Sequence, residues 1–184
     1  MLKPVWNLPN VISLTRILGV AFIVYFGVVD RNDLAVFLVF VWGSVTDWLD
    51  GYLARRLNQT SEFGAALDPI ADRLYIIAAI GVLLYRELIP LWAVVLIVGR
   101  ELFMAVHLVR TSRQGFAPPA VHYVGKAGTL LLLYAVPFIF LGATTTAVAD
   151  FARWLGVAFL MWGIGTYWVA GLLYVKQFRE IANG

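Results

Sequence analysis

The sequence predicts an all-α, polytopic membrane protein with six transmembrane helices and a short N-terminal interfacial segment, built as one domain over residues 1–184. Hydrophobic residues make up 61% of the chain and the mean hydropathy is +0.83, values typical of membrane proteins. The apolar residues gather in stretches of about 20, the length that crosses a bilayer as a helix. Charged residues, glycine and proline concentrate in the breaks between these stretches, where helices end.

The N-terminal segment precedes the first apolar stretch and carries Lys3, Trp6 and two prolines. This composition favours a short segment that lies among lipid headgroups. We expect no cleavable signal peptide, because the segment lacks the ordered charged, apolar and small-residue regions of one. Asn10 is suited to cap the first helix. Arg16 lies about two turns into that helix, where it either snorkels to the headgroups or faces a cavity and meets a phosphate.

Six stretches are apolar and long enough to span a membrane, and we expect each of them to be a helix. They run over Pro9–Val29, Leu34–Leu57, Phe63–Tyr85, Ile89–Val109, Val121–Leu141 and Phe151–Lys176. In the last stretch we expect Gly163, Gly165 and Gly171 to serve close helix packing.

The chain has no cysteine, which excludes disulfides and thiol catalysis. A net charge of +3 does not indicate nucleic-acid binding here, since in a membrane protein the location of Lys and Arg matters more than their sum. If six helices cross, one side receives only Arg31, Arg86 and Arg153, while Arg100 lies inside a stretch. The positive-inside rule then places both termini, and the segment between the second and third stretches, in the cytoplasm. We therefore expect an integral protein of the cytoplasmic membrane.

Four aspartates interrupt the apolar pattern where the second stretch ends and the third begins. Asp47 and Asp50 are three residues apart, and Asp68 and Asp72 four apart, so each pair shares one face of a helix. An ionised Asp at the centre of a membrane helix costs about 2.5–3.5 kcal/mol, so four of them require bound cations or a wet cavity. Oxygen ligands in this number suit Mg²⁺, Mn²⁺ or Ca²⁺ better than zinc. Small residues beside both pairs favour a ligand site over a solvated acidic helix end.

The aspartates belong to a longer pattern, D-x2-D-G-x2-A-R-x8-G-x3-D-x3-D. The residues that match it are Asp47, Asp50, Gly51, Ala54, Arg55, Gly64, Asp68 and Asp72. This pattern resembles the signature of the CDP-alcohol phosphatidyltransferase family, with every position and both spacers matched. Members of that family are membrane enzymes of about this length, so the resemblance covers the whole chain as a single CDP-alcohol phosphatidyltransferase membrane domain.

The resemblance implies that a phosphatidyl group moves from CDP-diacylglycerol to an acceptor hydroxyl, with release of CMP and with two divalent cations, Mg²⁺ or Mn²⁺, as cofactors. It implies that the metal ligands are Asp47, Asp50, Asp68 and Asp72, and that Asp72 is also the base for the attacking hydroxyl. It implies that the CDP group is bordered by Asp47, Asp50, Gly51, Ala54, Arg55, Gly64 and Asp68. We favour direct attack over a covalent aspartyl intermediate, because all four carboxylates already have roles. Relatives are commonly homodimers, which implies a homodimer here.

A second polar group lies in the fourth and fifth stretches. Arg100 is deep in apolar sequence, and an intramembrane arginine indicates a functional site with a partner. Glu101 points a different way round the helix, so adjacency alone does not neutralise the two. The partner is either structural (Glu101 or an aspartate of another helix) or a substrate phosphate. We expect a cationic pocket for a phosphate-bearing acceptor, formed by Arg100, Arg110, Arg113 and Lys126.

The two histidines do not have the spacing of metal ligands. We expect His107 to pack at a helix face or the membrane interface, and His122 to cap or line the entrance to the fifth stretch.

The Arg-Glu pair and the Gly-Lys pair at 125–126 resemble the branch of the family that uses glycerol-type acceptors. That branch contains cardiolipin synthases, which use phosphatidylglycerol, and phosphatidylglycerophosphate synthases, which use glycerol 3-phosphate. Many of the latter carry a further arginine about two turns after the Arg-Glu pair, where this chain has Leu108. We therefore favour phosphatidylglycerol as the acceptor and keep glycerol 3-phosphate as the alternative.

Two other classes fit the acidic cluster less well. Intramembrane prenyltransferases also bind diphosphate through aspartate-rich helices and Mg²⁺, but usually have more spans. A cation transporter with a carboxylate site midway through the bilayer would not require Gly51, Arg55 and Gly64 in register.

Overall fold

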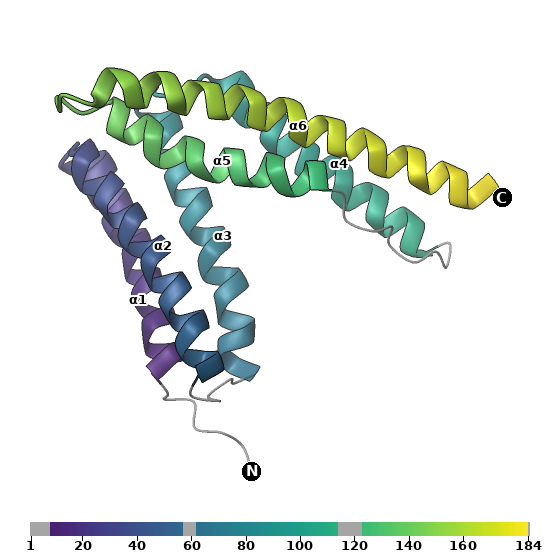
Figure 1. The fold of residues 1–184 in the computed structure, drawn as a ribbon, viewed down its shortest axis with the longest axis horizontal. Coiled ribbons are helices and arrows are strands. Elements are labelled where there is room, and N and C mark those ends of the chain that lie inside the picture. The colour runs from purple at the N-terminus through teal and green to yellow at the C-terminus, as the bar shows by residue number, and fades with distance from the viewer. Residues whose placement is uncertain (1–7, 57–61, 114–122, 184) are drawn as a thin grey trace, which may run out of the picture.

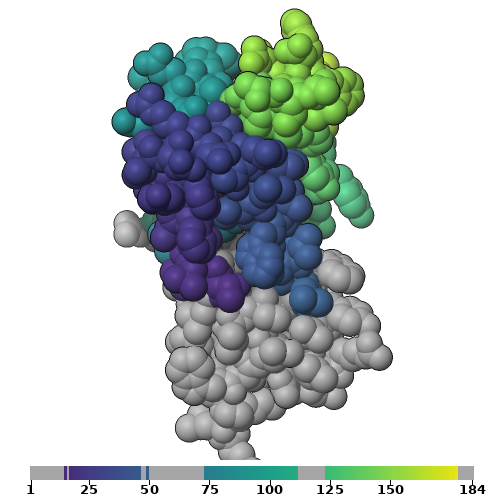
Figure 2. All heavy atoms as spheres, turned by 90° about the vertical axis from the view of Figure 1, so that its left-hand side faces the viewer, coloured from purple at the N-terminus to yellow at the C-terminus, as the bar shows by residue number. Residues whose placement is uncertain are grey.

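The computed structural model describes residues 8–56, 62–113 and 123–183, and it describes side chains in the coloured parts of Figure 2. All of the regular secondary structure in these residues is helical. The elements are α1 (Leu8–Val24), η1 (Tyr25–Val29), α2 (Asp33–Arg56), α3 (Glu62–Tyr85), α4 (Leu91–Arg113), α5 (Tyr123–Gly142) and α6 (Ala149–Asn183).

The helices match the six apolar stretches to within a few residues, apart from the longer end of α6, so the all-α prediction is confirmed for the described residues. The first stretch reaches Val29 because the π-helical segment η1 continues α1. The predicted span ends at Leu57 and Val121, and the predicted interfacial segment at residues 1–7, lie outside the described residues.

Three helices contain a described stretch that is long and apolar enough to cross a membrane. These stretches are Leu91–Thr111 in α4, Tyr123–Gly142 in α5 and Ala149–Gln177 in α6. The described apolar stretches in the first half of the chain are shorter, at Ile17–Val29, Asp33–Thr46 and Arg73–Tyr85. The remaining turns of α2 and α3 carry the charged motif.

The helices form two groups (Figure 1). α1, α2 and α3 lie side by side, and the α5–α6 hairpin lies across one end of them, with α4 packed against α6. Figure 2 shows α1 and α2 covering one face, with the α5–α6 turn in green beyond their ends. The largest fully buried side chains are Ile23, Val36, Leu83 and Phe140, which come from α1, α2, α3 and α5. The core therefore lies where the two groups meet.

Small residues allow the backbones of the α5–α6 hairpin to approach closely. A Cβ at Gly142 would lie 2.6 Å from Arg153 Cα, and one at Gly163 would lie 2.8 Å from Leu132 Cδ2. Without a hydrophobic force between helices in lipid, such van der Waals contact drives association. The packing role is confirmed for Gly163. For Gly165, where a Cβ would meet open space within the described part of the chain, it stays a prediction.

A buried ion pair joins the three N-terminal helices at the end remote from the aspartate motif. Arg86 Nη2 donates to Asp33 Oδ2 over 3.0 Å, and Nη1 lies 3.0 Å from Oδ1 without hydrogen-bond geometry. Nη1 also donates to the Gly27 carbonyl of η1 over 3.2 Å. Only 17% of the Arg86 side chain and 9% of the Asp33 side chain is exposed. Arg86 therefore holds the start of α2 and the end of η1 together.

Arg86→Leu is expected to destabilise the fold, since it leaves the Asp33 carboxylate buried without its cation. The cost is about 3–5 kcal/mol, which lowers the apparent melting temperature in detergent by on the order of 10 °C. Arg31→Gln is the matched control, because Arg31 is exposed at the same end. Equal melting temperatures for the two variants would show that the ion pair does not stabilise the fold.

Candidate active site

The two halves of the aspartate motif lie on two consecutive helices. Asp47 and Asp50 lie in the last turns of α2, and Asp68 and Asp72 lie in the first turns of α3. Gly51, Ala54, Arg55 and Gly64 are also within these helices. The side chains of all eight motif residues, and the connection over residues 57–61, lie outside the described parts. The predicted pair of aspartate-bearing helices is thus confirmed, while metal and CDP binding by these residues stay predictions.

Tyr75 joins α3 to α2 and α1 within one turn of the motif. Its hydroxyl donates to the Val39 carbonyl of α2 over 2.5 Å, and its ring meets Phe40 edge-on at 5.1 Å. The ring fits between two glycines. A Cβ at Gly43 of α2 would lie 2.6 Å from the Tyr75 hydroxyl, and one at Gly19 of α1 would lie 2.8 Å from Cε2. The three helices therefore meet around this one side chain.

Helical periodicity extends this contact to the motif. Asp47 and Asp50 follow Gly43 by four and seven residues, so they lie on the face of α2 that meets Tyr75. Asp72 and Asp68 precede Tyr75 by three and seven residues, so they lie on the corresponding face of α3. We therefore expect the two aspartate-bearing faces to be turned toward each other, as a shared metal site requires.

The donor set at these faces fits hard divalent cations. Four carboxylates supply only oxygen ligands, which Mg²⁺ and Mn²⁺ prefer, and their charge needs neutralising in a low-dielectric environment. Among the side chains that the structure describes, His, Asp and Glu do not gather in groups of three or more, so no competing metal centre is seen there.

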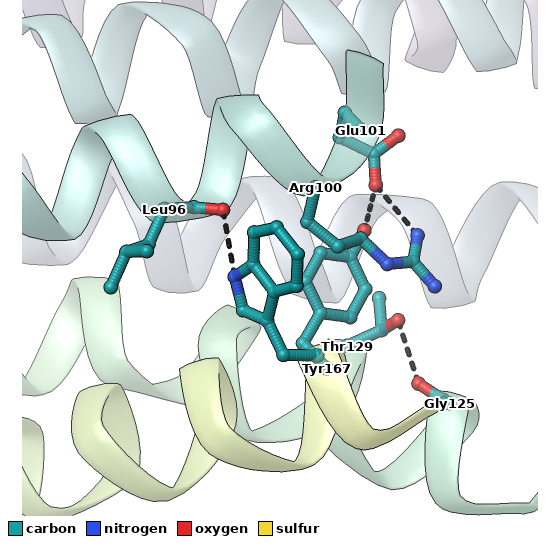
Figure 3. Close-up of polar contacts among 7 residues, drawn as sticks. Leu96, Arg100, Glu101, Gly125, Thr129 and Tyr167 are labelled. Atoms are coloured by element: carbon teal, nitrogen blue, oxygen red, sulfur yellow. Dashed lines mark hydrogen bonds and ion pairs between the residues drawn. The ribbon is translucent and has the colours of Figure 1, made fainter. Parts of the chain in front are cut away.

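Arg100 takes part in a second polar cluster, between α4 and α6 (Figure 3). Its Nη1 lies 3.1 Å from Glu101 Oε1, and the same oxygen accepts a hydrogen bond from the Tyr167 hydroxyl. The Arg100 guanidinium lies over the Tyr167 ring, with Cζ 3.9 Å from the ring centre. A cation over an aromatic ring contributes about 2 kcal/mol when both are desolvated. The Arg100 side chain is 11% exposed and that of Glu101 58%.

Glu101 was expected to leave the helix in a different direction from Arg100, and yet the charged ends of the two side chains meet. Adjacent residues leave a helix about 100° apart, but both side chains are long enough to bend toward α6, where Tyr167 holds the carboxylate. Of the partners considered, Glu101 is the one the structure shows. Arg100 Nε remains buried without a hydrogen-bond partner in the described part of the chain.

α6 is fixed against α4 and α5 around this cluster. The Trp168 indole donates to the Leu96 carbonyl of α4 over 3.1 Å, one turn before Arg100. On the α5 side, a Cβ at Gly128 would lie 3.0 Å from Tyr167 N and 3.2 Å from its Cα. One turn earlier in α5, the Gly125 carbonyl accepts from the Thr129 hydroxyl over 3.0 Å (Figure 3). α6 therefore lies between the Arg-Glu pair and the segment that carries Lys126.

The other cations predicted to bind the acceptor are not brought to Arg100 in the described residues. Arg110 is exposed and lies ten residues, or about 15 Å, further along α4. Lys126 is exposed at the start of α5, with Nζ 5.6 Å above the Tyr123 ring. The side chain of Arg113 lies outside the described parts. A single pocket formed by all four stays a prediction.

The histidine predictions have separate outcomes. His107 is half-buried and stacks on Phe103 at 6.3 Å, in line with a packing role, while His122 lies outside the described residues.

Tyr167 is the residue that sequence reasoning missed. It is separated from Glu101 by 66 residues, and the pattern of α6 shows it only as one of several aromatic residues. A usable signal was its phenol in apolar sequence, since a buried hydroxyl requires a partner.

Comparison with known proteins identifies the family. The family model for CDP-alcohol phosphatidyltransferase matches residues 6–162. The chain belongs to the CDP-alcohol phosphatidyltransferase family. It is therefore a transferase of phospholipid biosynthesis, and the family and the apolar helices together indicate a membrane protein.

Relatives in this family carry two kinds of name. A cardiolipin synthase (CMP-forming) of Streptomyces coelicolor is 40% identical, over 97% of this chain and 86% of the relative. A putative cardiolipin synthase of Mycobacterium tuberculosis is 34% identical over the same shares. A CDP-diacylglycerol--glycerol-3-phosphate 3-phosphatidyltransferase of Bacillus subtilis is 34% identical, over 84% of this chain and 89% of the relative. The resemblance read from the motif is confirmed.

Gly43→Val is expected to force the aspartate-bearing faces apart, because its side chain would occupy the position of the Tyr75 ring. A displacement of about 1 Å at a reacting site costs on the order of a hundredfold in rate, so release of CMP should fall by about that factor. Gly81→Val is the matched control on α3, where a Cβ meets open space. The facing arrangement is wrong if both variants retain full activity as purified, folded proteins.

Proposed function

We propose that this enzyme transfers the phosphatidyl group of CDP-diacylglycerol to a glycerol-type acceptor and releases CMP, and that the acceptor is phosphatidylglycerol. It would then act as a CMP-forming cardiolipin synthase. The observation that supports the reaction is the Tyr75 contact, which joins α3 to α2 and α1 within one turn of the aspartate motif in a chain of this family. Glycerol 3-phosphate is the alternative acceptor, supported by the Bacillus subtilis relative.

The four motif aspartates would hold two divalent cations, Mg²⁺ or Mn²⁺. Bound metal ions would neutralise the pyrophosphate of the donor and act as Lewis acids on its oxygens. Asp47, Asp50 and Asp68 would be the principal ligands, with Asp72 adjoining them. The mutual repulsion of the carboxylates, held on facing helices, supports this assignment because it has to be balanced by cations.

The residues of the motif would divide the remaining work. Asp72 would take the proton of the acceptor hydroxyl while the hydroxyl oxygen forms a bond to the lipid-side phosphorus. The bond from that phosphorus to the CMP oxygen breaks, and CMP leaves with the electron pair. The CDP group would be bordered by Gly51, Ala54, Arg55 and Gly64, since small residues let a nucleotide approach the helix backbone.

Arg100 would bind the acceptor phosphate. Its Nη1 is occupied by Glu101, whereas its buried Nε has no hydrogen-bond partner in the described part of the chain. A planar guanidinium binds a phosphate through such a free edge. Arg110, Arg113 and Lys126 would add positive charge along the path of an anionic lipid headgroup.

Two observations favour phosphatidylglycerol over glycerol 3-phosphate. The Streptomyces and Mycobacterium relatives, each aligned over 97% of this chain, carry the cardiolipin synthase name. Leu108 stands on an exposed face of α4 where many synthases that use glycerol 3-phosphate carry an arginine, so one cation for a small dianionic acceptor is missing. A lipid acceptor has a single phosphodiester charge and needs fewer cations.

We also propose that all six helices cross the cytoplasmic membrane and that two copies form a homodimer. Both termini and the aspartate-bearing ends of α2 and α3 would face the cytoplasm, because most Lys and Arg lie on that side in a six-span arrangement. The Arg86–Asp33 pair would then lie at the opposite surface.

Release of CMP from CDP-diacylglycerol should require both a divalent cation and Asp72. With phosphatidylglycerol as acceptor in detergent, we expect EDTA to abolish CMP release and added Mg²⁺ or Mn²⁺ to restore it. Asp72→Asn should lower the rate by about 10²–10⁴-fold, the usual contribution of a general base. Asp150→Asn, at an exposed position of α6, is the control. Full activity in EDTA, or in the Asp72 variant, would contradict the mechanism.

An acceptor panel separates the two glycerol-type reactions. We expect phosphatidylglycerol to support CMP release and cardiolipin formation, with glycerol 3-phosphate at least about tenfold less efficient in kcat/KM, because Leu108 leaves its second charge unpaired. Inositol phosphate and serine serve as negative controls. Preference for glycerol 3-phosphate would replace the first proposal by the alternative.

A further inference from the structure

We propose that Tyr167 is a positioning residue that holds the Arg100 guanidinium in the orientation in which it meets the acceptor. This inference rests on the proposed role of Arg100 in acceptor binding. It adds a residue of α6 that lies outside the aspartate motif and outside the cationic residues predicted to bind the acceptor.

Tyr167 contacts the arginine in two ways. Its ring covers one face of the guanidinium, with Cζ 3.9 Å from the ring centre. Its hydroxyl donates to Glu101 Oε1, the oxygen that also accepts from Arg100 Nη1. The Tyr167 ring therefore fixes the plane of the guanidinium. The Tyr167 hydroxyl fixes the Glu101 carboxylate, which in turn holds Nη1 of the guanidinium (Figure 3).

Gly171 completes a slot for the arginine stem. It lies one turn after Tyr167 on α6, and a Cβ there would lie 3.7 Å from Arg100 Nε and 3.9 Å from Cγ. The stem of Arg100 thus passes over Gly171 while its head lies on the Tyr167 ring. Arg100 Nη1 is held by Glu101, and the buried Nε is a donor left without a hydrogen-bond partner in the described residues.

Tyr167 is itself held from both sides. The backbone of α5 approaches it at Gly128, where a Cβ would lie 3.0 Å from Tyr167 N. Its neighbour Trp168 donates to the Leu96 carbonyl of α4. Without Tyr167, the flexible stem of Arg100 could snorkel, and the largely exposed Glu101 carboxylate could turn to other partners. A rigid phenol thus converts a mobile cation into a preorganised one, and acceptor affinity should depend on it.

The inference predicts a selective loss of acceptor affinity. Tyr167→Phe keeps the ring and removes the hydroxyl, so the KM for phosphatidylglycerol should rise about fivefold, while kcat and the KM for CDP-diacylglycerol change less than about twofold. Tyr167→Leu removes both contacts and should raise the acceptor KM by about twentyfold or more. Tyr134→Phe is the matched control, because the Tyr134 ring packs on Phe159, which lies eight residues, or about 12 Å, before Tyr167 along α6.

A double-mutant cycle tests whether Tyr167 acts through Arg100. Arg100→Gln alone should raise the acceptor KM, and adding Tyr167→Phe to it should have no further effect, since the group to be positioned is gone. A merely structural tyrosine would instead lower the melting temperature and give the same fold-change in both backgrounds. If Tyr167→Leu fails to fold, Tyr167→Phe alone still tests whether the effect on the acceptor KM depends on Arg100.

The outcomes separate this inference from the function on which it rests. If Arg100→Gln raises the acceptor KM but both Tyr167 variants match wild type, or act equally in both backgrounds, the positioning role is wrong and the proposed function stands. If Arg100→Gln leaves the acceptor KM unchanged, the acceptor role of Arg100 fails and this inference with it. Absence of acceptor-dependent CMP release in wild type would overturn both.

Discussion

The packing of α1, α2 and α3 around the Tyr75 side chain is the constraint on which the candidate active site depends. In lipid, apolar side chains gain little by meeting each other, so helices associate where small residues permit close contact and where polar groups find partners. Gly19 and Gly43 are the small residues that permit close contact with the Tyr75 ring. The Tyr75 hydroxyl finds its polar partner in the Val39 carbonyl. A bulky residue at either glycine would rotate or separate the helices at the end that carries the aspartates, whereas the Arg86–Asp33 pair holds them at the other end. Ionised aspartates without bound cations would oppose this assembly, so the neutral contact one turn away has to supply the geometry.

Much of the fold follows from the sequence because a bilayer imposes a simple rule on it. A helix is the only open segment that satisfies its own backbone in lipid, so apolar stretches of the right length predict elements with few alternatives. The ends of α3 and α5 illustrate this, since Tyr85 and Gly142 lie at or beside the predicted ends. The helix faces that carry the aspartates could be predicted equally well, because residues spaced three and four apart share a face of the same helix. Which helix each face would meet depended on Tyr75, whose partners are 36 residues away and carry no periodic signal.

The second cluster was harder to predict for the same reason. The direction in which Glu101 leaves the helix follows from the helix alone, but its pairing with Arg100 does not. Long side chains have several torsions, and a partner on another helix decides among them. Tyr167 is that partner, and the isolated sequence of α6 contains only a tyrosine beside a tryptophan. The spatial arrangement of the four cations predicted to bind the acceptor was equally hard to predict. Their charge was visible, whereas the 15 Å that separates Arg100 from Arg110 follows only from placing them on one helix.

The two helix groups suggest how one family can serve different acceptors. The aspartate motif belongs to α2 and α3, which are held by Tyr75 and by Arg86, and nothing in that arrangement depends on the acceptor. Arg100 and Lys126 belong to α4 and α5, and α6 lies between the segments that carry them. If Arg100 and Lys126 bind the acceptor as proposed, a substitution in the second group changes acceptor binding without moving the carboxylates. Relatives named for different acceptors align along most of this chain, as expected if the chemistry is built into the first group and the choice of acceptor into the second.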